Sequence, residues 1–435
     1  MVVYFYYKSS KYEKSNYVVL NTASMEIEYM KNLPYLDSHI YQMLWRYDKK
    51  LREEKKDYPL VKPKDLYRYK TDFEASCKKI KEFSNFDVRK SFDNASIVYG
   101  YFLLNTAKIK LNQATIDITE YDWMERTYNA GSQYFSEPGD YESYGYDYEG
   151  MYAHHIASDT FMFPSKGGKE AQLLEIELVK IPKKRSQLQC KFSDGTTFED
   201  LPFGYYNIKI LSTHKNIPKC FSFCKEHTYT NTCVHFAFAY QKKFDIKIEI
   251  VKSEANCYIY NNKDLVKGSS IFKNWHKNYL KLRAKYPKDK LVKHLSMIWG
   301  HLAAKNTMKI KLEDEHKYKI VMNKNQNGDY LELEFNDTYY TCTNLAQPTK
   351  YNFRIKPFLT SYCRAIMANL IIHNSGPKGI DNVIRVHTDG VVYTNRDPEL
   401  FKNPRNKGIY PEEKTTGFIR WENVDSYEKI NPTIR

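Results

Sequence analysis

Residues 384–393 read Ile-Arg-Val-His-Thr-Asp-Gly-Val-Val-Tyr, so two apolar runs flank a short polar Thr-Asp-Gly sequence. Apolar runs on either side of such a turn predict a tight β-hairpin. We expect Gly390 to provide the permissive backbone of the turn and Asp389 to lie at its tip. A lone Asp in a turn usually serves local hydrogen bonding, so this hairpin needs a second observation before it suggests chemistry.

A second acidic segment lies far upstream, at residues 146–152, Tyr-Asp-Tyr-Glu-Gly-Met-Tyr. Asp147 ends a tyrosine-rich stretch, and Tyr152 follows it by five residues. Two carboxylates from separate strands are the minimum needed to hold two metal ions on a triphosphate. Taken singly, Asp147 is equally compatible with a strand-end turn, and Tyr152 with ordinary core packing.

Charge and hydropathy narrow the class of protein. The chain of 435 residues carries 67 Lys and Arg against 52 Asp and Glu, a formal net charge of +15. This excess favours a polyanionic partner, although a solvated lysine-rich surface would also explain it. The sequence lacks an apolar run of about 18 residues and an N-terminal signal-peptide pattern. We therefore expect two or three domains, with neither membrane insertion nor secretion.

The eight cysteines are expected to be free thiols, because the chain has no secretion signal. One group invites a metal interpretation: Cys220, Cys224, His227, Cys233 and His235. Its residue types suit zinc, but the spacing is irregular and no paired knuckle is present. A zinc-dependent binding module is therefore a minor alternative.

Apolar periodicity gives an order of elements. Alternation predicts strands at residues 109–118, 170–182, 204–213, 246–251 and 308–341. Helical spacing predicts helices at residues 35–56, 229–237, 271–306 and 356–373, and residues 97–104 fit a buried strand or a core helix. Pro287 should break the basic region 271–306 into an antiparallel pair of helices, and Asn327-Gly328 should form a hairpin turn.

This order and three motifs resemble family B DNA polymerases, specifically the protein-primed branch of phages, viruses and linear plasmids. The family's first motif, Asp-x-x-Ser-Leu-Tyr-Pro, corresponds to residues 147–153. The resemblance implies that Asp147 is a metal ligand and that Tyr152 stacks under the sugar and excludes a ribose 2′-hydroxyl. Gly150 and Ala153 depart from the family's Ser and Pro.

The family's third motif, Asp-Thr-Asp-Ser, corresponds to residues 387–390, His-Thr-Asp-Gly. Asp389 matches the metal-binding carboxylate, whereas His387 replaces the first acid. The fingers motif, Lys-x-x-x-Asn-Ser-x-Tyr-Gly, corresponds to residues 293–300 with its lysine one residue out of register. The resemblance implies nucleotide binding by Tyr152, Lys293, Lys290, Arg283 and Ser296. It implies DNA contacts by Tyr128 and Gly131 of a linker, Trp299 and Gly300 of the fingers, and Thr388.

The implied fold class is α+β: a polymerase right hand with an antiparallel palm sheet, inserted helical fingers and an N-terminal α/β domain. The expected divisions are an N-terminal domain at 1–122, a first palm part at 123–265, fingers at 266–306, a second palm part at 307–425 and the start of a truncated or absent thumb at 426–435. Residues 1–122 offer only Glu26-Ile27-Glu28 in place of an exonuclease Asp-x-Glu motif, so no proofreading site is expected.

The implied function is a DNA-directed nucleotidyltransferase of DNA replication, which adds dNMP to a 3′ hydroxyl or to a protein primer hydroxyl. Two Mg²⁺ ions are implied, with Mn²⁺ as a substitute. The implied partners are primer-template DNA, dNTP and either a terminal protein or a chain that supplies the thumb. The implied location is the cytoplasm or a viral replication compartment.

The main alternative is a catalytically degenerate polymerase-like protein that serves as a DNA-binding or scaffold module, an interpretation that His387 and the missing parts favour. An RNA-directed RNA polymerase fits poorly, because position 152 is Tyr rather than an acid and the hairpin is Thr-Asp-Gly rather than Gly-Asp-Asp.

Overall fold

The computed structural model describes residues 4–8, 17–21, 26–30, 63–88, 94–106, 116–127, 130–179, 187–302, 305–311, 331–336, 339–344, 354–374, 379–394 and 409–430. The chain divides into two compact units. The first comprises residues 1–110 and 271–301, and the second comprises residues 111–270 and 302–435. The segment expected to form the fingers thus groups with the N-terminal residues, and the two expected palm parts group together. The finer five-part division stays a prediction.

The first unit combines a small sheet with helices. Its antiparallel strands are β1 (Tyr4–Lys8), β2 (Tyr17–Asn21) and β3 (Glu26–Met30), in that order across the sheet. Its helices are α3 (Pro63–Ser84), α4 (Asn94–Thr106), most of α8 (Gly268–Lys285), α9 (Lys290–His294), η4 (Leu295–Met297) and most of α10 (Ile298–Leu302). Phe102 of α4 packs on Phe272 and Trp275 of α8, with ring centroids 5.2 and 6.4 Å apart.

A buried carboxylate joins two helices of this unit. Asp289 caps α9 by accepting hydrogen bonds from the backbone N–H groups of Leu291 and Val292. Its other oxygen accepts from Ser76 Oγ at 2.9 Å and from Lys79 Nζ at 3.1 Å, both on α3. This cap restarts the chain as a helix after the break at Pro287, which confirms the predicted interruption.

The second unit is built around an antiparallel sheet in the order β23-β22-β5-β20-β19-β4, with β21 also paired to β5. The strands are β4 (Ser132–Phe135), β5 (Gly139–Tyr148), β19 (Val383–Thr388), β20 (Gly390–Tyr393), β21 (Ile409–Pro411), β22 (Gly417–Trp421) and β23 (Tyr427–Lys429). We call this sheet the main sheet. A buried cluster on it consists of Ile384, Val392, Ile419 and Trp421.

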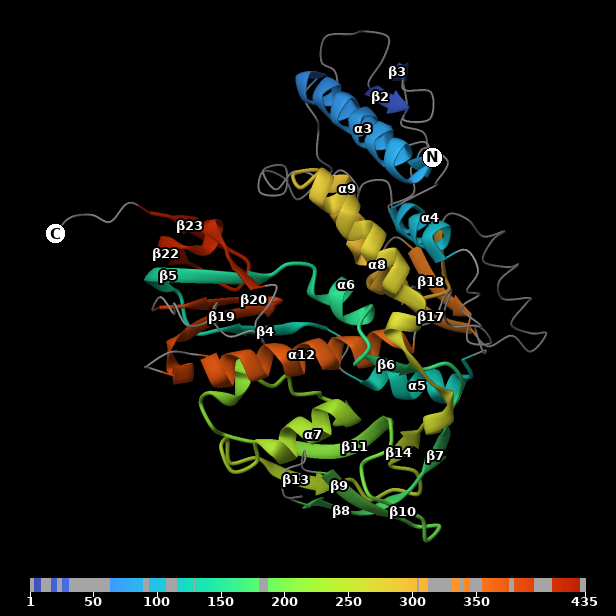
Figure 1. The fold of residues 1–435 in the computed structure, drawn as a ribbon, viewed down its shortest axis with the longest axis vertical. Coiled ribbons are helices and arrows are strands. Elements are labelled where there is room, and N and C mark those ends of the chain that lie inside the picture. The colour runs from blue at the N-terminus through green and yellow to red at the C-terminus, as the bar shows by residue number, and fades with distance from the viewer. Residues whose placement is uncertain are drawn as a thin grey trace, which may run out of the picture. The chain divides into compact units, whose positions relative to one another are not determined.

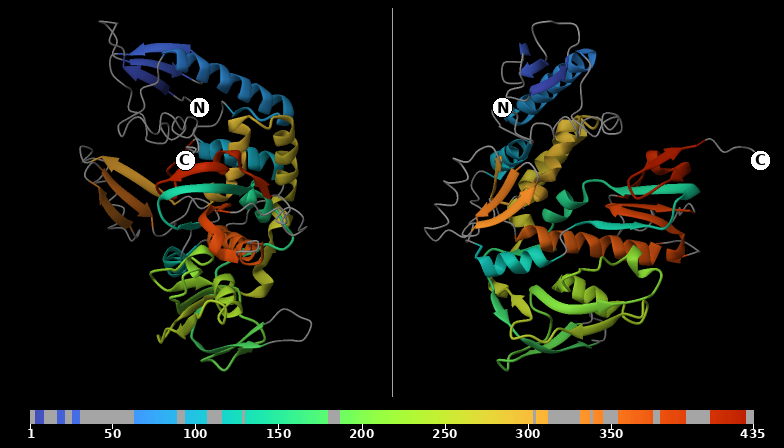
Figure 2. Two further views of the ribbon diagram at one scale, coloured as in Figure 1. Left: turned by 90° about the vertical axis from the view of Figure 1, so that its left-hand side faces the viewer. Right: turned by 180° about the vertical axis from the view of Figure 1, so that it is seen from behind.

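Helix α12 (Ile355–Asn374) crosses this unit between the main sheet and a second layer that holds α7 (Asn231–Ala239) and β11 (Gly204–Leu211), as Figures 1 and 2 show from different sides. It also packs on α6 (Met151–Ile156) and β6 (Met162–Pro164). The sheet that contains β11 also includes β7 (Lys169–Ala171), β12 (Thr228–Thr230), β13 (Lys247–Ile250) and β14 (Cys257–Ile259). Its strand order is β12-β11-β14-β7, and β13 also pairs with β11.

The remaining strands form three small antiparallel sheets. They are β8 (Leu173–Val179), β9 (Gln187–Phe192) and β10 (Thr197–Phe198); β6 with β15 (Leu265–Lys267); and β16 (Thr307–Lys311), β17 (Leu331–Asn336) and β18 (Tyr339–Asn344). Short 3-10 helices are η2 (Ile217–Lys219), η3 (Asn262–Asp264), η5 (Gly379–Asn382) and η8 (Glu413–Thr415).

A buried ion pair fixes helix α5 (Ile118–Arg126) to the residue that precedes α12. Glu120 accepts two hydrogen bonds of 2.6 Å from the Arg354 guanidinium and one of 2.8 Å from Tyr260 Oη. Burial raises the pKa of Glu120 above its usual range, although Arg354 and Tyr260 oppose the shift. The two parallel hydrogen bonds of such a bidentate pair offset part of the free-energy cost of removing both charges from water.

The structure confirms most predicted elements. Strands lie within 170–182, 204–213 and 246–251, helix α12 spans the predicted 356–373, and residues 97–104 form the core helix α4. The helix predicted at 229–237 begins at Asn231, because residues 228–230 pair as strand β12. The predicted helix at 35–56, most of the strand at 109–118 and the Asn327-Gly328 turn lie outside the described residues.

The mixed arrangement of helices with antiparallel sheets agrees with the α+β expectation, whereas the right-hand subdivision stays a prediction. No helix in the part of the chain that the structure describes combines the length and apolarity needed to cross a membrane.

Candidate active site

The predicted metal ligand Asp147 lies on strand β5 of the main sheet, and the predicted metal ligand Asp389 lies in the loop of the β19–β20 hairpin of the same sheet. The hairpin β19–β20 forms as predicted, with His387 paired to Gly390 across a two-residue loop that contains Asp389. Strand β20 also pairs with β5, and in that register Gly390 lies opposite Asp147. The backbone N–H of Tyr148 donates to the backbone oxygen of Asp389 at 2.9 Å. These pairings bring together Asp147 and Asp389, which we call the acid pair.

The hairpin turn differs from the prediction, because the left-handed backbone conformation lies at another residue. Thr388 has a φ of 60°, whereas Gly390 does not have a positive φ, so the prediction that Gly390 supplies the permissive backbone is wrong. A left-handed conformation is strained for a β-branched residue such as Thr388. Glycine serves another purpose at position 390, because a Cβ there would lie 3.3 Å from Asp147 Oδ1. The absence of a side chain at Gly390 leaves room for the Asp147 carboxylate.

The predicted linker lies against the strained turn. Strand β4 pairs with β19 so that Ser132 lies opposite Thr388. A Cβ on the preceding residue, Gly131, would lie 3.0 Å from Thr388 Cα and Cγ2. Arg364 of α12 donates to the backbone oxygen of Ala130 at 2.6 Å. The backbone of residues 130–131 is thus held between α12 and the turn, whereas Tyr128 lies outside the described residues.

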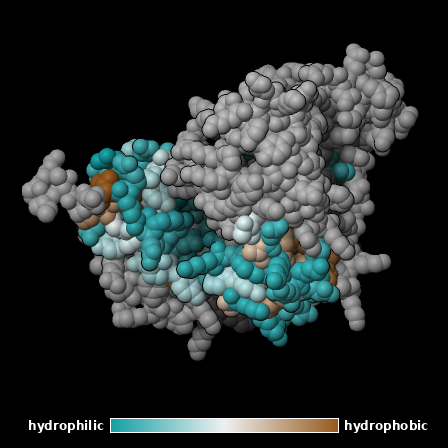
Figure 3. Space-filling view, turned by 90° about the horizontal axis from the view of Figure 1, so that it is seen from above, coloured by the Kyte–Doolittle hydropathy of each residue, from teal (hydrophilic) through white to brown (hydrophobic). Residues whose placement is uncertain are grey.

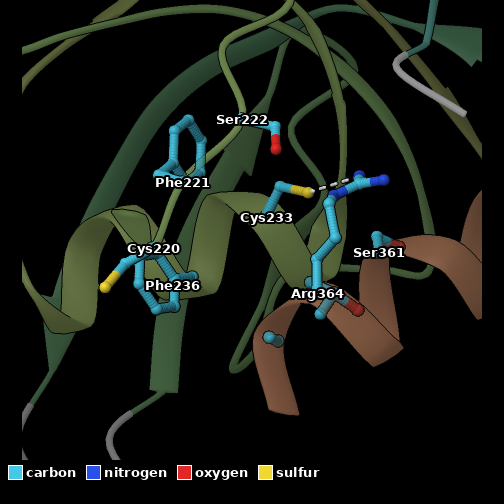
Figure 4. A pocket seen from close by; sticks show the side chains of 9 residues that line it. Cys220, Phe221, Ser222, Cys233, Phe236, Ser361 and Arg364 are labelled. Carbon is cyan, nitrogen blue, oxygen red and sulfur yellow. Dashed lines mark hydrogen bonds between the residues drawn. The ribbon is translucent and has the colours of Figure 1, made fainter. Parts of the chain in front are cut away.

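Arg364 also lines a small pocket between α7 and α12. Its guanidinium points from α12 toward Cys233 Sγ, 3.6 Å away, beside Ser361 of the same helix (Figure 4). Phe221 and Phe236 contribute aromatic rings to the apolar part of the lining. Arg364 is almost fully buried and donates to the backbone oxygen of Ala130. We therefore interpret the arginine as a structural support of the linker rather than as a ligand-binding group of the pocket.

Two cations lie within electrostatic reach of Asp147. Burial lowers the pKa of Lys414, but the hydrogen bond and charge of Glu412, with a smaller contribution from Asp147, raise it overall above its usual value. Burial lowers the pKa of Arg385, against the attraction of Glu412 and other acids that include Asp147. Lys414 Nζ lies 2.5 Å from Glu412 Oε1. The sequence motifs did not point to Lys414 or Glu412, because their proximity depends on the pairing of β21 and β22 with β5.

His387, which replaces the first acid of the family's third motif, contacts the carboxylate of Asp425 instead of adding a carboxylate to the turn. Its Nε2 lies 3.3 Å from Asp425 Oδ1, and its side chain is 34% exposed. Burial, followed by the positive charge of Arg385, lowers the pKa of His387 below its usual value. The hairpin loop therefore contributes one carboxylate to the acid pair, that of Asp389.

The donor set of the acid pair fits a hard divalent cation. Among the described residues, no group of three or more His, Cys, Asp and Glu side chains is arranged to hold a metal ion. Two carboxylates without a third ligand are the arrangement by which proteins hold Mg²⁺ together with substrate phosphates. The same observation leaves the zinc alternative unsupported: Cys224 Sγ donates to the Arg126 oxygen at 3.0 Å, and His235 lies 3.1 Å from Asp200. All eight cysteines are described and buried, and none is in a disulfide.

Tyr152 lies in α6, a short helix that begins after Gly150, whose φ is 62°. Its side chain is buried, with 5% exposure. The family departure at Gly150 therefore has a local reason, since the left-handed cap favours glycine. The proposed sugar-stacking role of Tyr152 stays a prediction.

The other predicted nucleotide-binding and DNA-binding residues belong to the first unit. Arg283 of α8 donates to the backbone oxygen of Pro287, and Ser296 Oγ donates to the Lys293 oxygen at 2.8 Å. Lys293 is exposed and Lys290 opens α9. Trp299 is half-buried and Gly300 is exposed, both in α10. Their roles in nucleotide and DNA binding stay predictions. Seen from above, the described part of the surface is mainly hydrophilic (Figure 3).

No family model matches the chain, and no curated protein matches it. Two solved structures of Phi29 DNA polymerase have a similar fold. One, complexed with primer-template DNA and incoming nucleotides, has a TM-score of 0.51 and 13% identity over 92% of this chain and 68% of that one. The other, complexed with single-stranded DNA, has a TM-score of 0.50 and 13% identity over 96% and 68%. At this identity the likeness concerns the fold alone, which is that of a DNA polymerase.

Proposed function

We propose that the chain is a template-directed DNA polymerase of the protein-primed family B type, which adds dNMP to a 3′ hydroxyl or a protein primer hydroxyl. The observation that carries the proposal is the strand register that places Gly390, next to Asp389, opposite Asp147. Two acids from distant segments meet there within a fold similar to that of a DNA polymerase. The proposed partners are primer-template DNA, dNTP and a terminal protein or a chain that supplies the thumb.

In this proposal the carboxylates of Asp147 and Asp389 hold divalent cations, Mg²⁺ or its substitute Mn²⁺, with the phosphates of the nucleotide. When bound, such cations neutralise phosphate charge and make the attacking hydroxyl a better nucleophile. Gly390 leaves space for the Asp147 carboxylate, and Asp389 lies in the hairpin loop next to the strained Thr388. The positive charges of Lys414 and Arg385 interact with the negative charge of Asp147. They therefore offset part of the negative charge of the acid pair.

The remaining roles follow from the motif resemblance. Tyr152 would stack under the sugar and discriminate against ribose, and Lys293, with Lys290, Arg283 and Ser296, would bind the nucleotide. Cationic side chains on a triphosphate stabilise charge that develops in the transition state. DNA would be held mainly through its phosphates, so binding should weaken as salt rises.

The test is extension of a labelled primer on a DNA template with dNTPs and Mg²⁺ or Mn²⁺. We expect Asp147→Asn and Asp389→Asn each to reduce extension by at least 10³-fold, because each removes a charged ligand without changing shape. Asp140→Asn is the matched control: it lies on the same strand β5, is exposed and pairs with Arg420. Extension by this control should equal that of the wild type.

Two results would count against the proposal. Full extension by both acid-pair variants would exclude the acid pair as the metal site. A folded wild-type chain that binds primer-template DNA without extending it, with binding unchanged in both variants, would favour the degenerate DNA-binding alternative. Incorporation of rNMP by Tyr152→Val tests the sugar role, and an unchanged preference for dNTP would remove Tyr152 from it.

A further inference from the structure

Helix α8 lies in a segment with no acidic residue. Residues 265–288 contain six lysines and one arginine, and no Asp or Glu. Lys273, Lys277, Lys281 and Lys285 recur at every fourth position of α8, and we call these four residues the lysine row. Residues four apart lie on the same side of a helix, one turn above another. The lysine row therefore concentrates positive charge along one side of α8.

The lysine row faces solvent. All four lysines are exposed, whereas Phe272, Trp275 and Leu282 of the same helix are buried. Within the described part of the chain, Lys273, Lys277 and Lys281 form no ion pair with a carboxylate. Among the described residues, Lys285 contacts the aromatic rings of Phe83 and Tyr286, at 5.9 and 5.4 Å from its Nζ. The positive charge of the row is thus not neutralised by the described residues.

An arrangement of this kind opposes the stability of the helix itself. Like charges four residues apart repel each other, and the row contains three such pairs, 273/277, 277/281 and 281/285. A helix face that serves only solubility gains stability from alternating acids and bases. Helix α3 shows that pattern, since Lys78 lies 3.9 Å from Glu82 one turn later. An external polyanion would relieve the repulsion in α8.

We propose that the lysine row of α8 binds the phosphodiester backbone of single-stranded DNA, in addition to any primer-template site at the acid pair. Steps of four residues rise about 6 Å, so the row is about 18 Å long. Phosphates of one strand follow each other about every 3.4 Å along the axis of a duplex and lie farther apart in an extended single strand, so the row is long enough to contact several phosphates.

The surroundings of the row favour one strand over a duplex. Its exposed neighbours on α8, Asn274, Leu280 and Ala284, carry no charge, so on this helix the positive surface is one lysine wide. Leu280, 49% exposed, offers an apolar contact that an unpaired base can cover and a paired base cannot. The proposal does not require the acid pair to be catalytic.

The first experiment measures the salt dependence of binding of a fluorescein-labelled oligo(dT) by anisotropy, with the full chain. The triple variant Lys273→Gln/Lys277→Gln/Lys281→Gln should lower the slope of log K against log salt by about 2, since each phosphate contact on a single strand contributes about 0.7. Two controls should keep the wild-type slope: the corresponding Lys→Arg triple, and Gln at three exposed lysines of the second unit, Lys209, Lys242 and Lys252. An unchanged slope in the Gln triple of α8 would overturn the proposal, as would an equal loss with duplex DNA.

The second experiment separates binding from helix stability. Lys277→Glu replaces two repulsive pairs with attractive ones, so it should raise the melting temperature by roughly 2–4 °C. If the row binds DNA, the same change should weaken oligo(dT) binding by at least tenfold at low salt. A more stable variant with unchanged binding would mean that the row is only solvated surface. Both experiments are run without dNTP and without a divalent cation, so failure of the proposed polymerase activity would not affect this result.

Discussion

Replacement of Gly131 by alanine should damage the acid pair through the strained turn. The new Cβ would lie 3.0 Å from Thr388 Cα and Cγ2 and 3.1 Å from Thr388 Oγ1. Carbon atoms pack best at about 3.5–4.0 Å, so Thr388 must move by several tenths of an ångström. Thr388 already has a φ of 60° and is paired with Ser132, so its backbone cannot relax freely. The displacement should pass to the next residue, Asp389.

The expected magnitude has two parts. Overpacking of a tight contact costs about 1–3 kcal/mol in the free energy of unfolding, and about 2 kcal/mol corresponds to a melting temperature lower by roughly 4–8 °C. A misplacement of 1 Å at a reacting centre costs about 10²-fold in rate. A shift of several tenths of an ångström at Asp389 should therefore reduce primer extension by roughly 10- to 100-fold.

The assay is primer extension alongside thermal unfolding, with a companion substitution at the other side of the contact. Thr388→Gly removes Cγ2 and Oγ1 and relieves a backbone conformation that costs a β-branched residue about 1–2 kcal/mol. The double variant Gly131→Ala/Thr388→Gly should regain most of the lost stability and activity. Wild-type extension and melting temperature in Gly131→Ala would refute this reasoning, as would a double variant no better than the single one.

Three other perturbations test separate features. Gly390→Ala places a Cβ 3.3 Å from Asp147 Oδ1 and should lower extension about tenfold with little change in melting temperature, which steady-state kinetics would reveal. Arg354→Met leaves the buried Glu120 carboxylate without its guanidinium and should cost about 3–5 kcal/mol in urea unfolding, most of it recovered by adding Glu120→Leu. Burial, helped by a neighbouring histidine, lowers the pKa of His155 from 6.5 to about 4. The folded chain therefore takes up this proton less readily than the unfolded chain, so stability should fall by up to about 3 kcal/mol as pH drops from 6.5 to 4. His155→Phe should flatten that dependence, and an equally steep profile would contradict the assignment.

Local patterns predicted the elements that depend on neighbours in sequence. The hairpin at 383–393 and helix α12 at 355–374 were readable because periodicity of two or 3.6 needs only a few residues. The break at Pro287 was readable because proline acts on its own turn of helix. The helix at 97–104 stayed ambiguous until the structure resolved it, since a short apolar run fits either element.

The role of Gly390 shows where local reasoning failed. Turn chemistry favours glycine at a positive φ, and a glycine beside Asp389 suggested that role. The structure gives the positive φ to Thr388 and uses Gly390 to accommodate Asp147 from another strand. Lys414 was missed for the same reason, because its place near Asp147 follows from strands that pair with β5. No pattern within a few residues carries such information.

The sequence alone determined which side chains are candidates: Asp147 in a tyrosine-rich strand end, Asp389 in a hairpin loop, and the basic residues of the helical region 271–306. These follow from residue type and short spacing. Only the tertiary structure decided that the two acids meet, that the turn beside Asp389 is strained against Gly131, and that the lysine row is exposed. The physical reason is that strand pairing between segments distant in the chain depends on closure of the whole sheet and burial of its core, to which every strand contributes.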